Sequence, residues 1–376
     1  MGSNPTGGTD QQQYPARLLA VRPPTLVVVT REELVAGWTW FAERECRGYS
    51  PLYEAISTAV AASTELHERL LACSNHVRQP NMLLAAMHDL VLRDEEPDLG
   101  AHYGGAAPTV ADTGRLFVET ALRRWEDLVP VLKARRTQTN EVGRIAVLAP
   151  ALATVTPNEP VTLIDVGTSA GLTLTLPHCR IDFGDRGVLG PPDSPVRVEC
   201  AVLGGNPPVR PTNIRRRIGL DRRPLDPNDP DDARWLLACT WPDTGRLERT
   251  RAALALAAAH PSELRTGDAV TDLPALLTEI DGPIVVTTTW ALAYLPEDAR
   301  AAFVDVLAAG SADRRVSWVS CEAPGVVNGL PQIDPPDVAG TSASVVGATT
   351  FRNGNIVERT TLGHAHPHGR WLWWHR

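Results

Sequence analysis

Apolar residues recur at helical spacing through the first part of the chain, and the pattern changes near residue 160. Thr30 and Glu33 form a Thr-x-x-Glu capping box, which predicts a helix start ahead of the apolar residues that follow. A longer apolar stripe over residues 116–132 has the three- and four-residue spacing of one helix face. The pattern therefore predicts an N-terminal helical cap over residues 25–158.

Strands and helices are expected to alternate beyond this region. We predict strands over residues 161–166, 179–183, 196–203, 263–266, 283–289 and 315–321. We predict helices over residues 170–177, 231–259, 272–279 and 297–309. Asn353-Gly354 predicts the turn of an antiparallel hairpin, and residues 204–232, rich in Pro, Arg and Asp, are expected to form a long connection. Residues 159–376 should thus form an α/β domain whose mainly parallel sheet is covered on both faces and ends in a C-terminal hairpin.

The composition argues against several classes of protein. The formal net charge of -8 disfavours a general nucleic-acid binder, and no apolar run approaches the roughly 18 residues that a membrane span needs. Residues 1–13 lack the basic start and apolar core expected of a secretory signal, and residues 1–24 are expected to be a disordered or extended tail. The six cysteines contain no Cys-x-x-Cys pair, as in a reduced cytoplasmic protein. The expected partner is a small-molecule substrate.

The stretch Asp165-Val166-Gly167-Thr168-Ser169-Ala170-Gly171 has two incompatible interpretations. As Gly-x-Ser-x-Gly it matches the nucleophile elbow of hydrolases, with Ser169 as nucleophile and Asp268 and His366 as the other triad members. As an apolar strand followed by a glycine loop it matches the start of a nucleotide-binding βαβ unit. A hydrolase elbow follows several strands of its own sheet, whereas the residues before this loop are mainly helical. The order of elements therefore favours the ligand loop.

In that interpretation, polar groups stand at the ends of successive strands, where open α/β sheets bind ligands. Asp182 ends the next predicted strand, at the place where an acid can bind the ribose hydroxyls of an adenosine ligand. The residues predicted to bind S-adenosylmethionine are Asp165, Gly167, Ser169, Gly171, Asp182, Asp268 and Thr288. Because Ser169 replaces the middle glycine of the usual Gly-x-Gly-x-Gly pattern, a loop that binds no cofactor is the alternative.

Longer motifs follow one another along the chain. They include Arg47-Gly48-Tyr49-Ser50-Pro51, Arg78-Gln79-Pro80-Asn81, Thr137-Gln138-Thr139-Asn140-Glu141-Val142-Gly143-Arg144, Asp229-Pro230-Asp231-Asp232-Ala233-Arg234-Trp235-Leu236 and His366-Pro367-His368-Gly369-Arg370-Trp371. In this order they resemble the bacterial family called domain of unknown function 2332, over roughly residues 35–375. The resemblance implies a core similar to class I methyltransferases, with no general reaction. It also implies that Ser169 belongs to the family pattern and that His is common at the position of Thr288.

Three polar residues of one motif, Asn140, Glu141 and Arg144, would share a helical turn if a helix begins near Asn140. Glu141 could then remove a proton from an amine or hydroxyl, and Arg144 could hold an acidic group through two hydrogen bonds. The alternative is a capped helix start with an ion pair on its surface. Tyr294 follows the central predicted strand and could face the pocket or pack as an ordinary aromatic residue.

His364, His366 and His368 alternate and would share one face of a strand, a spacing that can bind a metal. Pro367 interrupts regular pairing and no acid or cysteine completes the set, so we predict no metal site. His366 and His368 are instead candidates for proton transfer or for a structural role. A group of arginines in the predicted connection could hold an anionic substrate or form a solvated segment: Arg215, Arg216, Arg217, Arg222 and Arg223.

These observations are compatible with three functions. The first is a small-molecule tailoring enzyme of specialised metabolism that uses S-adenosylmethionine, with Glu141 or His366 removing the proton of the nucleophile. The second is a cofactor-free displacement within one substrate, in which an amine expels an anionic group such as sulfate and closes a small ring, with a partner subunit or a second copy. The third is a non-catalytic interaction scaffold.

Overall fold

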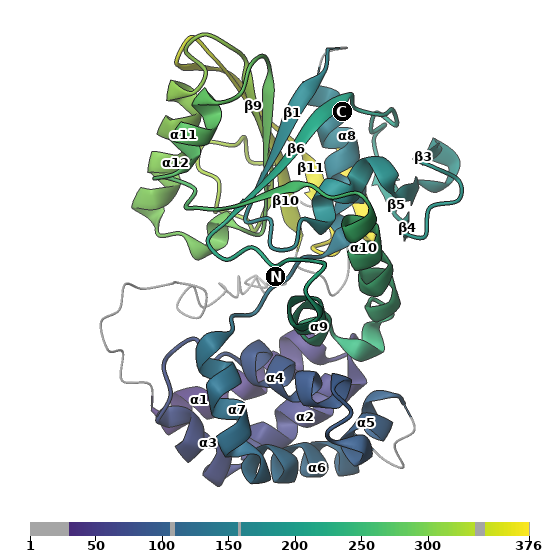
Figure 1. Cartoon of the computed structure of the whole chain (residues 1–376), viewed down its shortest axis with the longest axis vertical. Coiled ribbons are helices and arrows are strands. Elements are labelled where there is room, and N and C mark those ends of the chain that lie inside the picture. Colours follow the sequence, from purple (N-terminus) through teal and green to yellow (C-terminus); the bar gives the residue numbers. More distant parts are fainter. Residues whose placement is uncertain (1–29, 106–109, 157–158, 335–342, 376) are drawn as a thin grey trace, which may run out of the picture.

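The first part of the chain is helical and lies below the sheet in Figure 1. In the computed structural model its helices are α1 (Arg31–Trp40), the π-helix η1 (Phe41–Cys46), α2 (Pro51–Ala62), α3 (Thr64–Leu71), α4 (Pro80–Leu92), α5 (Pro97–Tyr103), α6 (Val110–Arg123) and α7 (Trp125–Ala134). The predicted capping box is confirmed, because Thr30 and Glu33 each accept the other's backbone N–H through their side chains. The predicted tail, residues 1–24, lies outside the residues that the structure describes, which are 30–105, 110–156, 159–334 and 343–375.

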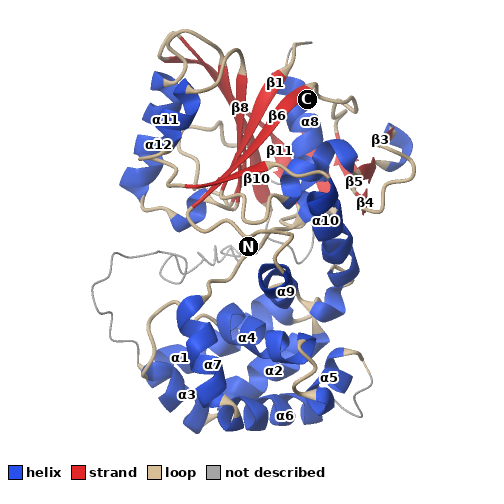
Figure 2. Cartoon of the chain, in the orientation of Figure 1, coloured by secondary structure: helices blue, strands red, loops and turns tan. Residues whose placement is uncertain are grey.

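A nine-stranded sheet forms the centre of the second part, within the described ranges (Figure 2). Its order is β5-β12-β11-β10-β9-β8-β1-β6-β7. These strands are β1 (Val161–Val166), β5 (Ala201–Gly204), β6 (Ile214–Asp221), β7 (Glu263–Thr266), β8 (Ile284–Thr289), β9 (Val316–Glu322), β10 (Ser344–Arg352), β11 (Asn355–Ala365) and β12 (Trp371–Trp374). From β9 to β7 all neighbours are parallel, so the carboxyl ends of these strands meet at one edge. The α/β class and the mainly parallel sheet are thereby confirmed.

The predicted C-terminal hairpin is also confirmed. β10 and β11 pair antiparallel, and the turn residues Asn353 and Gly354 have φ angles of 51° and 75°. Two positive φ angles are what a type I′ turn requires, which explains the Asn-Gly pair. β10 in turn pairs antiparallel with β9, so the hairpin extends the parallel part of the sheet.

Helices cover both faces of the sheet. The helices of this second part of the chain are η2 (Val142–Arg144), α8 (Ile145–Val155), η3 (Leu172–His178), η4 (Gly184–Arg186), α9 (Pro230–Ala238), η5 (Pro242–Thr244), α10 (Leu247–Ala259), α11 (Leu273–Thr278), η6 (Leu292–Tyr294) and α12 (Glu297–Ala309). Alternate residues of the strands enter two cores: Leu163 and Val285 join the core that contains α8 and the N-terminal helices, while Ile164 and Val286 join α11 and α12. α8 thus packs on the sheet although it falls within the predicted cap region. No helix in the described ranges has the length and apolar character that crossing a bilayer requires.

The sequence prediction missed one strand at the heart of the sheet. β6 falls within the predicted connection 204–232, yet it lies directly beside β1. The predicted strand 179–183 lies instead in a separate small sheet, formed by β2 (Arg180–Asp182), β3 (Val188–Leu189) and β4 (Arg197–Glu199). The predicted strand 196–203 is divided between β4 of this small sheet and β5 of the main sheet. The predicted helix 170–177 is the 3-10 helix η3, and the predicted helix 231–259 is interrupted between α9 and α10, where Pro242 and the left-handed Gly245 stand.

Candidate functional site

The loop after β1 lies at the carboxyl edge of the parallel strands. Gly167, Ser169 and Gly171 have left-handed backbones, with φ angles of 77°, 53° and 71°. Such a conformation costs a residue other than glycine on the order of 1–3 kcal/mol, so the surroundings must hold Ser169 in place. A Cβ on Gly167 would lie 2.5 Å from the Cβ of Ala291, which explains why glycine is needed where this loop packs on the segment after β8.

Asn140 clamps both ends of this loop. Its Nδ2 donates to the carbonyl oxygen of Thr168 at 2.9 Å, and its Oδ1 accepts from the N–H of Leu172 at 2.8 Å. Because the side chain is buried, water does not compete strongly for the groups that form these two hydrogen bonds. The structure therefore places this predicted site residue as a support for the loop conformation.

Replacing Asn140 by alanine should lower the free energy of unfolding by about 1–3 kcal/mol, because two buried backbone groups lose their partner. Urea denaturation measures this change. The control is Asn355→Ala, since the exposed amide of Asn355 bonds only to the carbonyl of Asn353 in the hairpin turn. The control should stay within about 0.5 kcal/mol of the wild type. Equal losses in both variants would contradict the clamp.

The acidic residue at the end of the strand next to β1 is Asp221, the last residue of β6. The sequence prediction did not find it. Its Oδ2 accepts from the N–H of Ser169 at 2.9 Å, and its Oδ1 accepts from the N–H of Arg223 at 2.8 Å. Asp182, which we predicted for this place, ends β2 in the smaller sheet and does not belong to this edge. The available signal was the short apolar pattern of Ile218-Gly219-Leu220 just before Asp221.

Asp165 lies inside the sheet, not at its edge. Its two oxygens accept from the hydroxyls of Thr173 at 2.6 Å and Thr287 at 2.7 Å. Burial raises the pKa of Asp165, against the opposing effect of these hydroxyls. The carboxyl therefore helps to join β1, η3 and β8, and it is shielded from any ligand on the loop.

Two other predicted cofactor residues are likewise engaged within the protein. Thr288 is fully buried, and its hydroxyl accepts from the indole N–H of Trp318 at 3.1 Å. Asp268 binds the guanidinium of Arg222 through Oδ2 and accepts from the N–H of Val270 through Oδ1. Asp268 thus begins the turn that follows β7.

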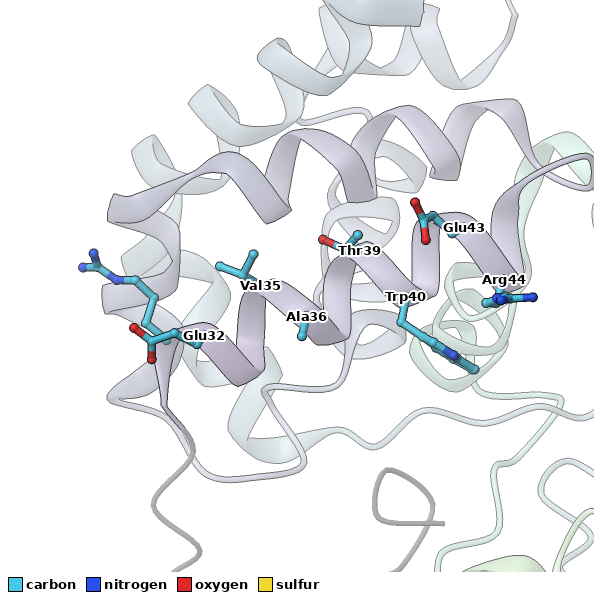
Figure 3. A pocket seen from close by; sticks show the side chains of 8 residues that line it. Glu32, Val35, Ala36, Thr39, Trp40, Glu43 and Arg44 are labelled. Atoms are coloured by element: carbon cyan, nitrogen blue, oxygen red, sulfur yellow. The ribbon is translucent and has the colours of Figure 1, made fainter. Parts of the chain in front are cut away.

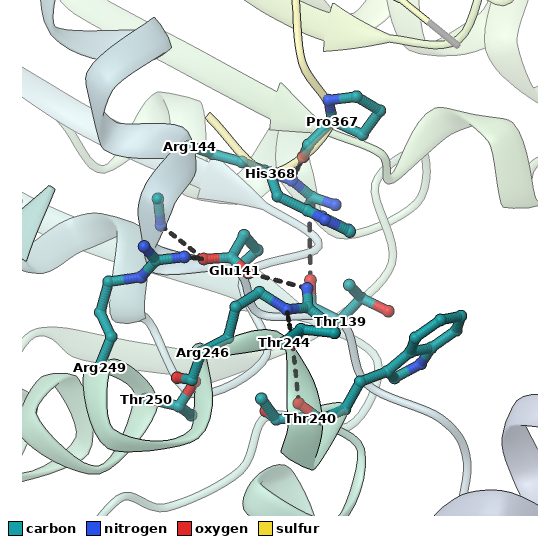
Figure 4. A network of polar contacts seen from close by, with 12 residues as sticks. Thr139, Glu141, Arg144, Thr240, Thr244, Arg246, Arg249, Thr250, Pro367 and His368 are labelled. Atoms are coloured by element: carbon teal, nitrogen blue, oxygen red, sulfur yellow. Dashed lines mark hydrogen bonds and ion pairs between the residues drawn. The ribbon is translucent and has the colours of Figure 1, made fainter. Parts of the chain in front are cut away.

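Glu141 forms a buried ion cluster (Figure 4). Oε2 accepts from Arg246 at 2.9 Å, while Oε1 accepts from Arg249 and from the N–H of Gly143, each at 2.8 Å. Burial alone raises the pKa of Glu141, but the charges of Arg246 and Arg249 and the N–H of Gly143 lower it to about 2. A carboxylate with so low a pKa is a weak proton acceptor near neutral pH, so the geometry favours a structural role.

Arg144 joins the end of β8 to the turn between β11 and β12. Its Nε donates to the carbonyl of Pro367 at 2.9 Å (Figure 4). Its Nη1 donates to the carbonyl of Thr289 at 3.0 Å. Nη2 makes no hydrogen bond to another residue in the described part of the chain. The same turn packs closely on η2, because a Cβ on Gly369 would collide with the carbonyl of Gly143. Arg144 is buried, and its guanidinium stays charged although burial lowers its pKa.

His366 and His368 lie in this turn and bring it against the helical cap. His366 Nδ1 accepts from the N–H of His368 at 2.9 Å, and His368 Nδ1 lies 3.1 Å from the hydroxyl of Tyr49. Burial and nearby arginines lower the pKa of His366 to about 4 and that of His368 well below its usual value. Both rings are thus neutral near pH 7. Among the described residues, no three side chains of His, Cys, Asp or Glu are grouped in a way that could hold a metal ion.

Glu322, the last residue of β9, was missed because the predicted strand stopped one residue earlier. It is fully buried. Oε1 accepts from the N–H groups of Ala291 at 3.1 Å and Leu292 at 3.2 Å, whereas Oε2 has no hydrogen-bond partner within 3.5 Å in the described part of the chain. The hydroxyl of Thr288 is close enough to act on the pKa of this carboxyl. Burial raises the pKa of Glu322 to about 7, against these N–H groups and the charge of Arg144. A carboxyl with such a pKa can gain or lose a proton at neutral pH.

Tyr294 is the exposed residue whose hydroxyl interacts electrostatically with this buried pair. Its side chain is 58% exposed, yet desolvation raises the pKa of its hydroxyl, and the charges of Arg144 and Glu322 act on it. The neighbouring Trp290 has a left-handed backbone, with a φ of 54°, and its indole N–H donates to Ser344. Strain of this kind in a bulky residue is typical of functional sites.

Two surface hollows lie apart from Arg144 and Glu322. An open groove of about 620 Å³ runs along α1 and η1 (Figure 3), lined by Arg31, Glu32, Val35, Ala36, Thr39, Trp40, Glu43 and Arg44. All of its walls come from one continuous helical segment, so no polar groups converge on it from elsewhere. A second hollow of about 340 Å³ adjoins Gly171 and lies between α10 and residues 224–228.

A profile of bacterial proteins described as "Uncharacterized protein conserved in bacteria (DUF2332)" matches residues 36–374. This match confirms the resemblance that the sequence motifs suggested. No curated protein and no solved structure matches the chain. The function is therefore inferred from the geometry.

Proposed function

The chain belongs to the bacterial DUF2332 family, and we propose that it is a small-molecule enzyme that works without S-adenosylmethionine. The proposed reaction is a displacement within one substrate, in which an amine attacks a neighbouring carbon and expels an anionic group such as sulfate. The observation that carries the proposal is the buried carboxyl of Glu322, with its pKa near 7, beside the buried guanidinium of Arg144. The first group can take a proton, and the second can hold the anion.

The strand order supports a methyltransferase-like core as the scaffold. Numbered along the chain, the parallel strands from β7 to β9 stand in the order third, second, first, fourth, fifth. This is the order of doubly wound sheets, which bind ligands beyond the carboxyl ends of their strands. Arg144, Glu322 and Tyr294 all lie at this edge, next to β8 and β9.

The loop after β1, however, does not fit S-adenosylmethionine. The N–H groups of Gly167, Ser169 and Leu172 already donate within the protein. Asp221 binds two backbone N–H groups where a cofactor site needs free oxygens for the ribose hydroxyls. The loop also leads into the 3-10 helix η3, so it lacks the α-helix N-terminus at which such folds hold negative groups. The proposed reaction therefore uses no cofactor.

In the proposed step the amine approaches past Tyr294, the exposed residue near the buried pair. As the amine nitrogen forms its bond to the neighbouring carbon, its proton passes to the free Oε2 of Glu322. The carbon–oxygen bond to the sulfate breaks at the same time, and its electron pair leaves with the sulfate. Arg144 stabilises the departing anion through Nη2, which has no partner in the described part of the chain.

The test uses a panel of amino-alkyl sulfates whose amine and sulfate stand on neighbouring carbons. Purified protein should release sulfate from at least one member, as measured by ion chromatography. Added S-adenosylmethionine should not change the rate, because the proposed step does not involve it. A panel from which no member loses sulfate would contradict the displacement.

Calorimetric titration provides the control for the cofactor. S-adenosylmethionine and S-adenosylhomocysteine at millimolar concentration should give no saturable heat with the wild type. Micromolar binding that disappears in Asp221→Ala would overturn the argument from the loop and favour methyl transfer. If both experiments are negative while Asn140→Ala still alters stability, the scaffold hypothesis gains support.

A further inference from the structure

We infer that the C-terminal end of α7 carries a binding site for a small tetrahedral oxyanion, phosphate or sulfate, formed by Arg136 and Arg223. This site is separate from Arg144 and Glu322, and it requires neither the proposed reaction nor a cofactor. It lies where the end of the helical cap meets the end of β6, close to the loop after β1.

Hydrogen bonds to the same helix end bring the two guanidinium groups together. Arg136 Nη1 donates to the carbonyls of Lys133 at 3.1 Å and Arg135 at 2.7 Å. Arg223 Nη1 donates to the carbonyl between them, that of Ala134, at 3.2 Å. Two side chains that bind three successive carbonyls of one helix end must be neighbours, although they are 87 positions apart in the sequence.

This pair of cations lacks a counter-charge. Neither Arg136 nor Arg223 forms an ion pair in the described part of the chain, and burial together with the charge of Arg223 lowers the pKa of Arg136. The ring of His76 binds the preceding helix carbonyl, that of Leu132, at 3.1 Å, and burial and the charges of Arg136 and Arg223 lower its pKa. The repulsion between neighbouring positive groups would be relieved by a bound anion.

Three arginines near these two in the sequence do have an acidic partner. Arg216 pairs with Glu263 and Arg222 pairs with Asp268. Arg135 pairs with Asp232 at 2.5 Å. Arg217 has no ion pair in the described part of the chain, but it is half-buried and its guanidinium donates to three backbone carbonyls.

The two arginines are also available to a ligand. Arg223 is exposed and Arg136 is half-buried. Each arginine bonds to the helix through Nη1 only. The Nε and Nη2 groups of both side chains can therefore donate to an oxyanion. Guanidinium groups bind phosphate and sulfate through paired N–H groups, which makes arginine the preferred residue for such anions.

The site is tied directly to the loop after β1. The N–H of Arg223 donates to Asp221, whose other oxygen accepts from Ser169. The side chain of Gln138 donates to the carbonyl of Arg223, and Gln138 is two residues from the clamp residue Asn140. An anion bound here would therefore lie at the same edge of the sheet as Arg144 and Glu322.

The test measures the binding of inorganic phosphate to the full chain, without any reaction. At constant ionic strength set with sodium chloride, phosphate should raise the melting temperature saturably, by about 2–5 °C. The double variant Arg136→Gln/Arg223→Gln should lose at least two thirds of this rise. The matched control Arg352→Gln, which removes a charge from an exposed residue of β10, should keep it.

A second readout covers the case in which the double variant is too unstable to compare. Broadening of the phosphate phosphorus resonance, recorded where every variant is folded, should disappear in the double variant and persist in Arg352→Gln. The same series with sulfate decides which oxyanion binds more tightly. Equal melting shifts and equal broadening in all variants would overturn the site and leave non-specific ion effects only. Because no turnover is measured, failure of the sulfate-release test would not bear on this result.

Discussion

Replacing Glu322 by glutamine is expected to lower the rate of sulfate release by a factor of about 100 to 10,000, as for the loss of a general base. Glutamine keeps an Oε1 that can accept from Ala291 and Leu292, so the loop after β8 should stay in place. In the wild type, kcat/KM should show an ionisation near pH 7, because only the ionised carboxylate accepts a proton, and a separate rise at higher pH from deprotonation of the substrate amine. In the variant the residual rate should lack the ionisation near pH 7.

The control for this experiment is Glu297→Gln, which makes the same change at an exposed residue in the first turn of α12. Its rate and pH profile should match those of the wild type. A Glu322→Gln variant that keeps both the full rate and the ionisation near pH 7 would contradict the proposed role of this carboxyl.

The same substitution should also stabilise the protein at alkaline pH. The folded-state pKa of Glu322, about 7, lies above the ordinary value of 4.5. For an acid shifted in this direction, stability falls as the pH rises from about 4.5 through 7. Glutamine carries no such penalty, so Glu322→Gln should gain roughly 1–3 kcal/mol above neutral pH and little near pH 4. Higher stability with lower activity distinguishes a functional carboxyl from a structural one.

Replacing Glu141 by glutamine is expected to lower the free energy of unfolding by about 3–5 kcal/mol, the usual effect of removing one partner of a buried ion pair. The side chains of Glu141 and Arg246 are 4% and 7% exposed, so the arginine left behind could not be solvated by water. Arg249 would lose its carboxylate as well. Chemical denaturation at neutral pH measures the loss.

The matched control is Glu248→Gln, which breaks an exposed pair with Arg251 on α10. It should change stability by no more than about 0.5 kcal/mol. The pH dependence provides an independent check. The pKa of Glu141 in the folded state, about 2, lies below its ordinary value of 4.5. Its contribution is therefore fully present above about pH 4.5 and is lost as the pH falls toward 2. Between these values the wild type should lose stability more steeply than the variant; parallel curves would contradict the cluster.

The sequence predicted those strands whose own residues form an apolar run. The apolar runs of β1, β8 and β9 were found, and so was the hairpin turn at Asn353-Gly354. β6 was missed because three consecutive arginines resemble a solvated segment. Distant partners make this strand possible: Arg216 binds Glu263, and Arg217 donates to the carbonyl of Leu174. Since these contacts join residues more than 40 positions apart, no local pattern reports them.

The candidate site was predicted only in part, because it also depends on contacts between residues that are distant in the sequence. The polar motif around Asn140 was singled out correctly as a place of dense interactions, but the role of each residue depends on partners elsewhere. Glu141 could not be assigned to an ion cluster without knowing that Arg246 lies beside it. Glu322 could not be found at all, because its raised pKa arises from burial and not from its neighbours in the sequence. The sequence prediction chose Asp182 and not Asp221 as the ribose-binding acid because it missed β6, the strand that ends in Asp221.

The turn between β11 and β12 has a consequence for how the molecule folds. Arg144 binds this turn across 223 residues of sequence, and Tyr49 meets His368 across 319. Contacts between such distant segments require the closure of very long loops and are associated with slow folding. The helical cap, whose helices pack mostly on one another, can form early, whereas Arg144 receives its surroundings only when the final strands dock. A nearly complete folding intermediate would then contain most of the secondary structure and still have no working site.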